Sequence, residues 1–452
     1  MHTLSQLRAG ELAGITRLDL SCGLTSFPDE IFNLADSLEI LNLSGNALSS
    51  LPDDLPKLHK LRVIFCSDNL FTALPEVLGQ CLRLEMVGFK ANQINTVSEK
   101  SLPKKLRWLI LTDNKITELP SALGSCIDLQ KLMLSGNQLQ TLPVEMAACR
   151  RLELLRISAN DFTALPELLL SLPKLAWLAY AGNPFSDTYE AAVTAEQKIT
   201  CIDWATIELQ QSLGEGASGI IYRANYLQKD QSLPVAVKVF KGAVTSDGLP
   251  RSEKAASIAV SGHSGLIPVI GEISHHPQNA SGLVMTLMES NFVNLAQPPS
   301  LESCTRDIYS AERRFTLAQV LSIALNIASV ANHLHAKAIM HGDLYAHNIL
   351  WNKQTESLLG DFGAASFLPL HNNHLAENIQ RLEVRAFACL LEELLPLCDV
   401  SPGIQPIFDS MVSLQNNCAQ EEVAQRPLFI EIESILMALE TQVNYDSLRI
   451  SS

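Results

Sequence analysis

The first 185 residues repeat one pattern of apolar and polar positions. Each copy reads L-x-x-L-x-L-x-x-N, with other apolar residues replacing some leucines, and most copies end in Leu-Pro. The asparagines of successive copies are 22 or 23 residues apart, and they are Asn46, Asn69, Asn92, Asn114, Asn137, Asn160 and Asn183. A degenerate first copy over 15–28 has Gly23 at this position. Such a period predicts a solenoid in which each unit buries its apolar face against the next.

The spacing that recurs from copy to copy predicts a role for each kind of position. The leucines of L-x-x-L-x-L are expected to point inward from a short strand, and the asparagine to satisfy backbone groups where the chain leaves that strand. Cys81, Cys126 and Cys149 each stand three residues before the first leucine of a copy, which indicates small core positions. The array resembles the leucine-rich repeat family, in particular its intracellular LP-containing type.

The third and fifth positions of each repeat strand are expected to face the concave surface. In the middle of the array most of these positions are apolar. We expect a protein partner there, because large exposed apolar patches are uncommon on monomers. The predicted apolar centre is Phe65, Met86, Trp108, Ile110 and Met133, and the charged rim is Lys131 and Arg156. For the last copy, an alternative is that the following domain covers Trp177.

The repeat pattern stops after residue 185, and a different organisation begins. We predict a leucine-rich repeat domain over 1–186, a capping helix (187–199) and linker within 187–206, and a second domain over 207–452. LGEGASGIIYRA (213–224) places its glycines between two strand-like runs, which favours a hairpin over phosphates rather than a dinucleotide-binding turn. PVAVKVF (234–240) has Lys238 inside an apolar strand, where an ammonium group needs a charged partner.

Two further segments, HGDLYAHNIL (341–350) and LLGDFGAAS (358–366), complete an ordered set. Asp343 precedes Asn348 by 5 residues, and Asn348 precedes Asp361 by 13. The four segments together resemble the protein-kinase superfamily over the second domain. The fold class expected for the whole chain is therefore an α/β leucine-rich repeat solenoid followed by a two-lobed α+β protein-kinase-like domain.

The resemblance implies an ATP site. The backbone of the glycine loop would cover the triphosphate, and Lys238 would contact the inner phosphates with Glu253 as its helix partner. The glycines are Gly214, Gly216 and Gly219, and the residues that match the adenine pocket are Ile221, Ala236, Leu350, the gatekeeper Met285, and Met288 in the segment after it.

The resemblance also implies the groups that act on the transferred phosphate. Asp343 would accept or orient the proton of the substrate hydroxyl. Asn348 and Asp361 would hold Mg²⁺, which prefers amide and carboxylate oxygens.

Several positions depart from the family pattern. Gly342 replaces the arginine that usually precedes the catalytic aspartate, and Ser366 is the only hydroxyl between Gly363 and Glu383. We therefore expect no switching by phosphorylation of this segment, which is also short for a peptide-docking platform. Glu383 stands where the family has an aspartate that braces the catalytic loop. Tyr345 stands where Ser/Thr kinases commonly have lysine, so tyrosine specificity stays open.

Charge and cysteine usage limit the expected partners and the expected cellular compartment. The formal net charge is −15, of which −11 belongs to residues 201–452. An acidic domain disfavours nonspecific binding to nucleic acid or anionic membranes, and no uninterrupted apolar run approaches 18 residues. The ten cysteines form no C-x-x-C pair. We expect a cytoplasmic protein with reduced thiols and no nucleic-acid or membrane partner.

The sequence favours an ATP-dependent protein kinase, most of all a Ser/Thr kinase, whose repeats recruit a substrate or regulator. A small-molecule phosphotransferase of the choline-kinase or aminoglycoside-kinase type is an alternative, because those enzymes share H-G-D and a short activation segment. An ATP-binding interaction scaffold is a second alternative. The scaffold class predicts loss of Lys238, Asp343, Asn348 or Asp361, and all four are present.

Overall fold

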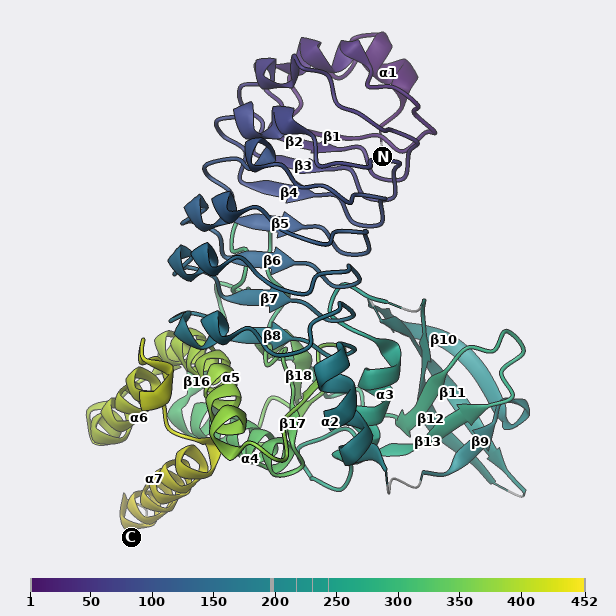
Figure 1. Ribbon diagram of the computed structural model, residues 1–452. Coiled ribbons are helices and arrows are strands. Elements are labelled where there is room, and N and C mark those ends of the chain that lie inside the picture. The colour runs from purple at the N-terminus through teal and green to yellow at the C-terminus, as the bar shows by residue number, and fades with distance from the viewer. Residues whose placement is uncertain (1, 196–198, 217, 230, 243, 451–452) are drawn as a thin grey trace. The chain divides into compact units, whose positions relative to one another are not determined.

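Two structural units make up the chain. The computed structural model describes residues 2–195, 199–216, 218–229, 231–242 and 244–450 (Figure 1). By their internal contacts, residues 1–175 with 183–185 form the first unit, and residues 176–182 with 186–452 form the second.

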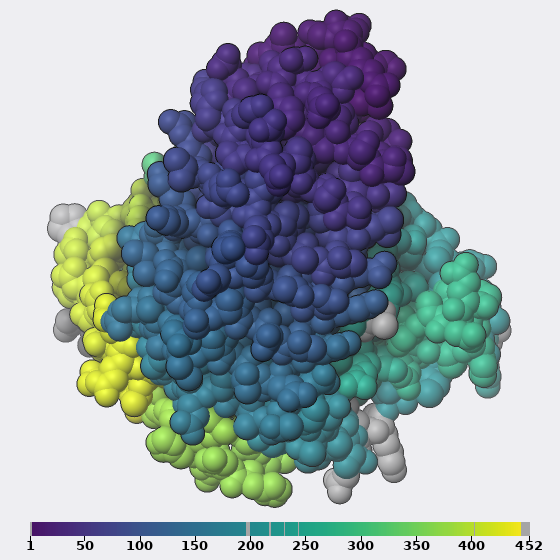
Figure 2. Space-filling model, turned by 45° about the horizontal axis from the view of Figure 1, so that its top comes forward, coloured from purple at the N-terminus to yellow at the C-terminus, as the bar shows by residue number. Residues whose placement is uncertain are grey.

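The repeats form a parallel sheet with its strands in chain order, as the periodicity predicts. The middle residue of each three-residue strand is buried, because it is an inward-pointing leucine or its equivalent. Figure 2 shows successive repeats as one densely packed surface, coloured in chain order. After the short helix α1 (Leu4–Arg8), the strands are β1 (Arg17–Asp19), β2 (Ile40–Asn42), β3 (Val63–Phe65), β4 (Met86–Gly88), β5 (Trp108–Ile110), β6 (Lys131–Met133), β7 (Leu154–Arg156) and β8 (Trp177–Ala179).

Short 3₁₀ segments return the chain from one strand to the next. A repeat of 22 or 23 residues must also include the strand and two turns, so it has no room for a longer helix. The 3₁₀ segments are η1 (Asp29–Leu34), η2 (Leu55–Lys57), η3 (Glu76–Gln80), η4 (Glu99–Ser101), η5 (Ser121–Ser125), η6 (Val144–Ala148) and η7 (Glu167–Ser171).

The repeated asparagines form a ladder of buried hydrogen bonds. Asn137 donates from Nδ2 to the carbonyl oxygens of Leu111 and Leu134, both at 2.9 Å, and its Oδ1 accepts from the backbone N–H of Ile116 at 3.0 Å. Asn69, Asn92, Asn114 and Asn160 repeat this arrangement. Each side chain satisfies groups from adjacent repeats, which confirms the structural role predicted for it.

The three repeat cysteines are core residues. Cys81, Cys126 and Cys149 are buried, and burial raises the pKa of each thiol to about 11. A thiol that stays protonated at neutral pH is a poor nucleophile and a poor metal ligand. These cysteines therefore fill space, as predicted.

The concave face is less exposed than the sequence pattern predicts. Met86 and Met133 are only 1% and 6% exposed, although the pattern places both at outward strand positions. Arg156 is 0% exposed and is not a solvent-facing rim. Phe65, Trp108 and Ile110 keep partial exposure, so the predicted centre of five residues is reduced to three.

The smaller lobe of the second unit is a sheet with one helix. Its strand order is β10-β11-β12-β14-β13-β9, and all neighbours are antiparallel except β13 and β9. Val235, Val237 and Val284 form its core with Ile202 of β9. The elements are β9 (Cys201–Asp203), η8 (Trp204–Thr206), β10 (Ile207–Glu215), β11 (Gly219–Gln228), β12 (Gln231–Phe240), α3 (Pro250–Ala259), β13 (Val269–Ser274) and β14 (Gly282–Thr286).

The larger lobe is mainly helical. Between its helices lie short strand pairs that carry the loops of the candidate site, notably β17 with β20 and β18 with β19. The elements are β15 (Val293–Asn294), β16 (Phe315–Thr316), α4 (Leu317–Ala336), β17 (Ile339–Met340), η9 (Ala346–Asn348), β18 (Ile349–Trp351), β19 (Ser357–Leu359), β20 (Ser366–Phe367), α5 (Asn373–Leu394), η10 (Leu395–Leu397), β21 (Cys398–Asp399), η11 (Pro402–Ile404), α6 (Gln405–Cys418), η12 (Val423–Gln425) and α7 (Phe429–Ile450).

Helix α4 is long and apolar enough to cross a membrane by length and composition. It carries buried leucine, isoleucine, valine and alanine residues along most of its length and packs against α7, α5 and β17. More than half of its most apolar window lies inside the protein. Its apolar character is accounted for by its position in the core of the larger lobe.

The stretch predicted as cap and linker takes up regular structure. Helix α2 (Pro184–Thr194) occupies much of the predicted helix over 187–199, of which residues 196–198 lie outside the described residues. Farther on, β9 pairs with β13 and extends the sheet of the smaller lobe.

The asparagine ladder gives a stability prediction. Asn137→Ala should lower the free energy of unfolding of the repeat array by about 1–3 kcal/mol or more, because it leaves buried backbone groups without partners. Urea denaturation followed by circular dichroism measures the change. Asn95→Ala, at an exposed position of the same array, is the matched control. Equal midpoints for both variants would contradict the structural role of the ladder.

Candidate active site

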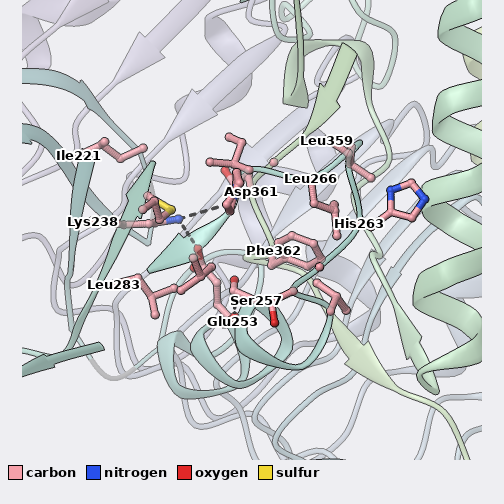
Figure 3. A pocket seen from close by; sticks show the side chains of 18 of the residues that line it. Ile221, Lys238, Glu253, Ser257, His263, Leu266, Leu283, Leu359, Asp361 and Phe362 are labelled. Carbon is pink, nitrogen blue, oxygen red and sulfur yellow. Dashed lines mark hydrogen bonds and ion pairs between the residues drawn. The ribbon is translucent and has the colours of Figure 1, made fainter. Parts of the chain in front are cut away.

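The site is organised around the ammonium group of Lys238. Lys238 lies in β12 between Ile221 of β11 and Leu283 of β14, and only 7% of the residue is exposed. Its Nζ bonds the carboxylate of Glu253 on α3 and lies 3.5 Å from Oδ1 of Asp361 (Figure 3). The strand therefore buries a cation that two carboxylates neutralise.

The electrostatics keep this arrangement charged. Burial alone would lower the pKa of Lys238, but the carboxylates of Asp361 and Glu253 outweigh burial and raise it. For Asp361, partial loss of contact with water favours the neutral acid, but the charge of Lys238 outweighs this effect and lowers the pKa. About half of the Asp361 side chain, 52%, is exposed, so its oxygens are accessible to a ligand.

These residues line a cavity of about 420 Å³. Ile221, Lys238, Glu253, Met285 and Asp361, all singled out from the sequence, contribute to its wall. Ala236 lies beside Met285 in the sheet but is not a lining residue. The other predicted adenine residues, Leu350 and Met288, and the three loop glycines also lie outside this cavity wall.

The glycine loop has the predicted hairpin form. Strands β10 and β11 are antiparallel, and the N–H of Gly216 donates to the carbonyl oxygen of Gly219 at 2.9 Å. A Cβ at position 219 would stand 2.5 Å from the carbonyl oxygen of Val239, so the close strand approach requires glycine there. At Gly214 and Gly216 a Cβ would meet nothing within 4 Å. The loop backbone is accessible there, which fits a cover over phosphates.

The loop over 341–348 brings Asp343 and Asn348 together. Asn348 donates from Nδ2 to the carbonyl oxygen and to Oδ2 of Asp343, both at 2.9 Å. The His341 Nε2–H donates to the carbonyl oxygen of Gly360 at 2.9 Å, and its Nδ1 accepts from the N–H of Asp343 at 3.2 Å. His341 thus ties this loop to the segment that carries Asp361.

Glu383 supports the same loop from α5. Its Oε1 accepts from the N–H of Gly342 at 2.7 Å, and its Oε2 accepts from Nε2 of His335 at 2.8 Å. Burial alone would raise the pKa of Glu383, but the hydrogen bond and charge of His335, together with Gly342, lower it. The longer acid therefore occupies the bracing position predicted for it.

The donor atoms fit a magnesium ion. Asp361 offers an accessible carboxylate and Asn348 an amide oxygen, and both are hard oxygen ligands. Among the described residues there is no group of three or more His, Cys, Asp or Glu able to hold a metal. A bound ion would therefore need phosphate or water oxygens to complete its coordination.

Comparisons with known proteins match both units. Residues 207–390 match the family model for protein tyrosine and serine/threonine kinase, and residues 104–162 and 37–58 match leucine-rich repeat models. The chain carries leucine-rich repeats and a protein kinase domain. Such a domain implies ATP and typically Mg²⁺, and leucine-rich repeats generally mediate protein–protein interactions.

Curated relatives match only part of the chain. The serine/threonine-protein kinase-transforming protein mos of Moloney murine sarcoma virus (strain ts110) is 27% identical over 172 residues, which is 37% of this chain and 47% of that protein. The mouse proto-oncogene serine/threonine-protein kinase mos is 28% identical over 172 residues, 37% of this chain and 48% of that protein. The chain thus matches about half the length of these relatives.

A solved structure of a leucine-rich repeat protein is also similar to this chain. It is a leucine-rich repeat protein of Leptospira interrogans, 29% identical, with a TM-score of 0.38, covering 40% of this chain and 47% of that chain.

Two contacts of the loop over 341–348 were not predicted from the sequence. His347 lies with Nδ1 2.7 Å from Oδ1 of Asp307, and although burial would lower the pKa of His347, this carboxylate raises it. Tyr345 stacks on Trp177, with ring centroids 4.1 Å apart and an interplanar angle of 6°. Both residues lie within three positions of Asn348, which was a signal, but their partners lie 40 and 168 positions earlier in the sequence.

Glu383 gives a pH-dependent prediction. Its folded pKa is below the ordinary value of 4.5, so its stabilisation is present above that pH and is lost as the pH falls through the folded value. Glu383→Gln should destabilise the kinase domain by about 1–3 kcal/mol at pH 7, because an amide N–H then faces the donor of Gly342 or His335.

Unfolding curves between about pH 3.5 and 7 measure this difference. The gap between wild type and variant should begin to narrow below about pH 4.5, where Glu383 of the unfolded chain becomes protonated, and should go on narrowing as the pH falls toward the lower folded pKa. A gap that stays constant across the range would contradict an ionised Glu383.

Proposed function

We propose that the chain is an ATP-dependent protein serine/threonine kinase. The observation that carries the proposal is the assembled set of Lys238, Glu253 and Asp361 beside a loop in which Asn348 holds Asp343. A lysine paired with the helix glutamate is the arrangement in which a kinase can bind phosphates productively.

Each residue has a distinct part in the proposed reaction. Lys238 contacts the inner phosphates, and the glycine-loop backbone covers them and excludes water. Asn348 and Asp361 hold magnesium, which when bound neutralises charge on the phosphates. Asp343 accepts or orients the hydroxyl proton of the substrate, and the Asn348 amide fixes the direction of its carboxylate.

Serine/threonine specificity is supported by the mos relatives. Tyr345 replaces the usual lysine, so its position gives no independent support. One observation favours a small-molecule phosphotransferase as a second candidate. Only residues 364–372 lie between the D-F-G motif and α5, and residues 364–369 are buried, which leaves little chain for a peptide platform.

The catalytic proposal predicts strong effects of two substitutions. Asp343→Asn and Lys238→Ala should each lower the turnover number by about 10²- to 10⁴-fold, because positioned proton transfer and phosphate contacts are lost. Transfer of labelled phosphate from Mg-ATP to proteins, peptides and small alcohols or amines measures it. Label on small molecules alone would favour the second candidate. A wild-type rate in Asp343→Asn would overturn the role of Asp343.

The finer proposal for the repeats is a protein partner on the concave face. Phe65 and Trp108 meet edge to face at 6.5 Å, and Nζ of Lys131 lies 4.3 Å from the centre of a Trp108 ring. Gly88 makes room for this cluster, because a Cβ there would stand 2.5 Å from the Phe65 ring. An aromatic anchor with an adjacent cation is typical of the centre of a binding surface.

The partner proposal predicts that Trp108→Ala weakens partner binding by more than about 2 kcal/mol. Proteins retained by the wild-type chain from a lysate should be lost from Trp108→Ala. They should remain on Val144→Ala, a control at an exposed apolar residue of η6. Identical retention by all three chains would contradict a partner on this face.

We also propose a cytoplasmic location. All ten cysteines are free thiols, which suits a reducing compartment.

A further inference from the structure

The segment that leaves the repeats is built into the kinase unit. Trp177 of β8 is 1% exposed and stacks on Tyr345 of the catalytic loop. Its Nε1 donates to the carbonyl oxygen of Leu344 at 3.1 Å. One side chain thus holds the loop by a face-to-face ring contact and by a hydrogen bond, one residue after Asp343.

The same segment holds the short chain that follows the D-F-G motif. The backbone N–H of Tyr180 donates to Oγ of Ser366 at 3.0 Å, and the Tyr180 hydroxyl donates to the carbonyl oxygen of Phe367 at 3.0 Å. Ser366 is 0% exposed. The only hydroxyl side chain between Gly363 and Glu383 is therefore inaccessible to a modifying enzyme in the described structure.

Gly342 shows that the contact excludes a side chain at the position of the usual arginine. Its φ is +73°, and a Cβ there would meet the carbonyl oxygens of Ala364 and Leu178, the latter at 2.7 Å. The backbone of β8 therefore occupies the space into which a residue at 342 would extend. Glycine at 342, where the family usually has arginine, is therefore what allows the backbone of Leu178 to pack so closely.

The segment then reaches α3, the helix that carries Glu253. In α2, Glu190 accepts from the hydroxyl of Ser252 at 2.7 Å, and Asp187 pairs with Arg251 at 3.0 Å. Arg251 and Ser252 are the two residues immediately before Glu253. They hold the turn that presents Glu253 to Lys238.

We propose that residues 176–182 and 186–194, the bracing segment, replace a phosphorylated activation loop and hold the catalytic loop and α3 in their working positions. A phosphorylated loop usually does this by pairing with the arginine before the catalytic aspartate. Here Gly342 has no charge to offer, and Trp177 and Tyr180 supply the restraint by packing and hydrogen bonds. Trp177 is a positioning residue that acts on Asp343 through the loop.

The central test is Trp177→Ala in the full chain. The turnover number should fall on the order of 10- to 100-fold, since a small displacement of a catalytic group has that effect, while ATP affinity changes by less than about 3-fold. Trp177→Phe keeps a ring on Tyr345 but loses the bond to Leu344, so it should recover much of the rate. Trp204→Ala removes a partly buried tryptophan that packs on His276 and controls for a general loss of stability.

A second arm addresses α3. Ser252→Ala removes the hydroxyl that bonds Glu190 and leaves Glu253 in place. It should raise the KM for ATP at least about 3-fold with a smaller change in turnover number, because Lys238 and Glu253 act on the phosphates. Phosphatase treatment of the wild-type enzyme should leave its rate unchanged.

The inference rests on the proposed kinase activity, so hydrogen–deuterium exchange supplies a readout without catalysis. Trp177→Ala should speed exchange of the amides of residues 341–348, and Trp204→Ala should not. If Trp177→Ala exchanges faster than the wild type but the wild-type chain transfers no phosphate, the proposed function is refuted and the brace stands. Trp177→Ala with wild-type turnover and exchange, or a wild-type rate that collapses after phosphatase treatment, would overturn the brace. If Trp177→Ala does not fold, the same two readouts on Trp177→Phe decide.

Discussion

The need to neutralise one buried ammonium group determines where several elements of the kinase unit must lie. Lys238 lies in the middle of an apolar strand, where an unpaired charge is expensive. Glu253 must therefore approach from α3, and Asp361 from the segment after β19. Because these carboxylates belong to different lobes, the pairing requires both lobes to adopt one particular arrangement. Elements that hold α3 or the catalytic loop in place therefore also help to keep Lys238 paired with Glu253 and Asp361.

Two supports act on the catalytic loop from different directions in the chain. Glu383 binds the backbone of Gly342 from α5, and Trp177 binds the loop at Leu344 and Tyr345. Neither contact includes a phosphate group. If the bracing segment acts as proposed, the kinase domain is held ready by its own preceding chain.

The repeats obey a simpler rule. Each unit has three strand residues and one asparagine, and the buried backbone groups of one unit are satisfied by the next. This leaves outward positions free to vary, so binding chemistry can accumulate there without loss of the fold. The proposed partner site, the cluster of Phe65, Trp108 and Lys131, uses such outward positions.

The sequence by itself determined the repeat register, the strand centres, the glycine hairpin and the order of Lys238, Asp343, Asn348 and Asp361. These follow from local periodicity and from motifs whose spacing is short. The resemblance to protein kinases also singled out Glu253 and Glu383.

Only the tertiary structure decided which outward residues stay exposed. Met86, Met133 and Arg156 are buried, and the local repeat pattern does not record what packs on an outward position. The structure alone also paired Trp177 with Tyr345 and explained Gly342. Such contacts join residues more than 160 positions apart, and no local pattern records which distant surfaces will meet.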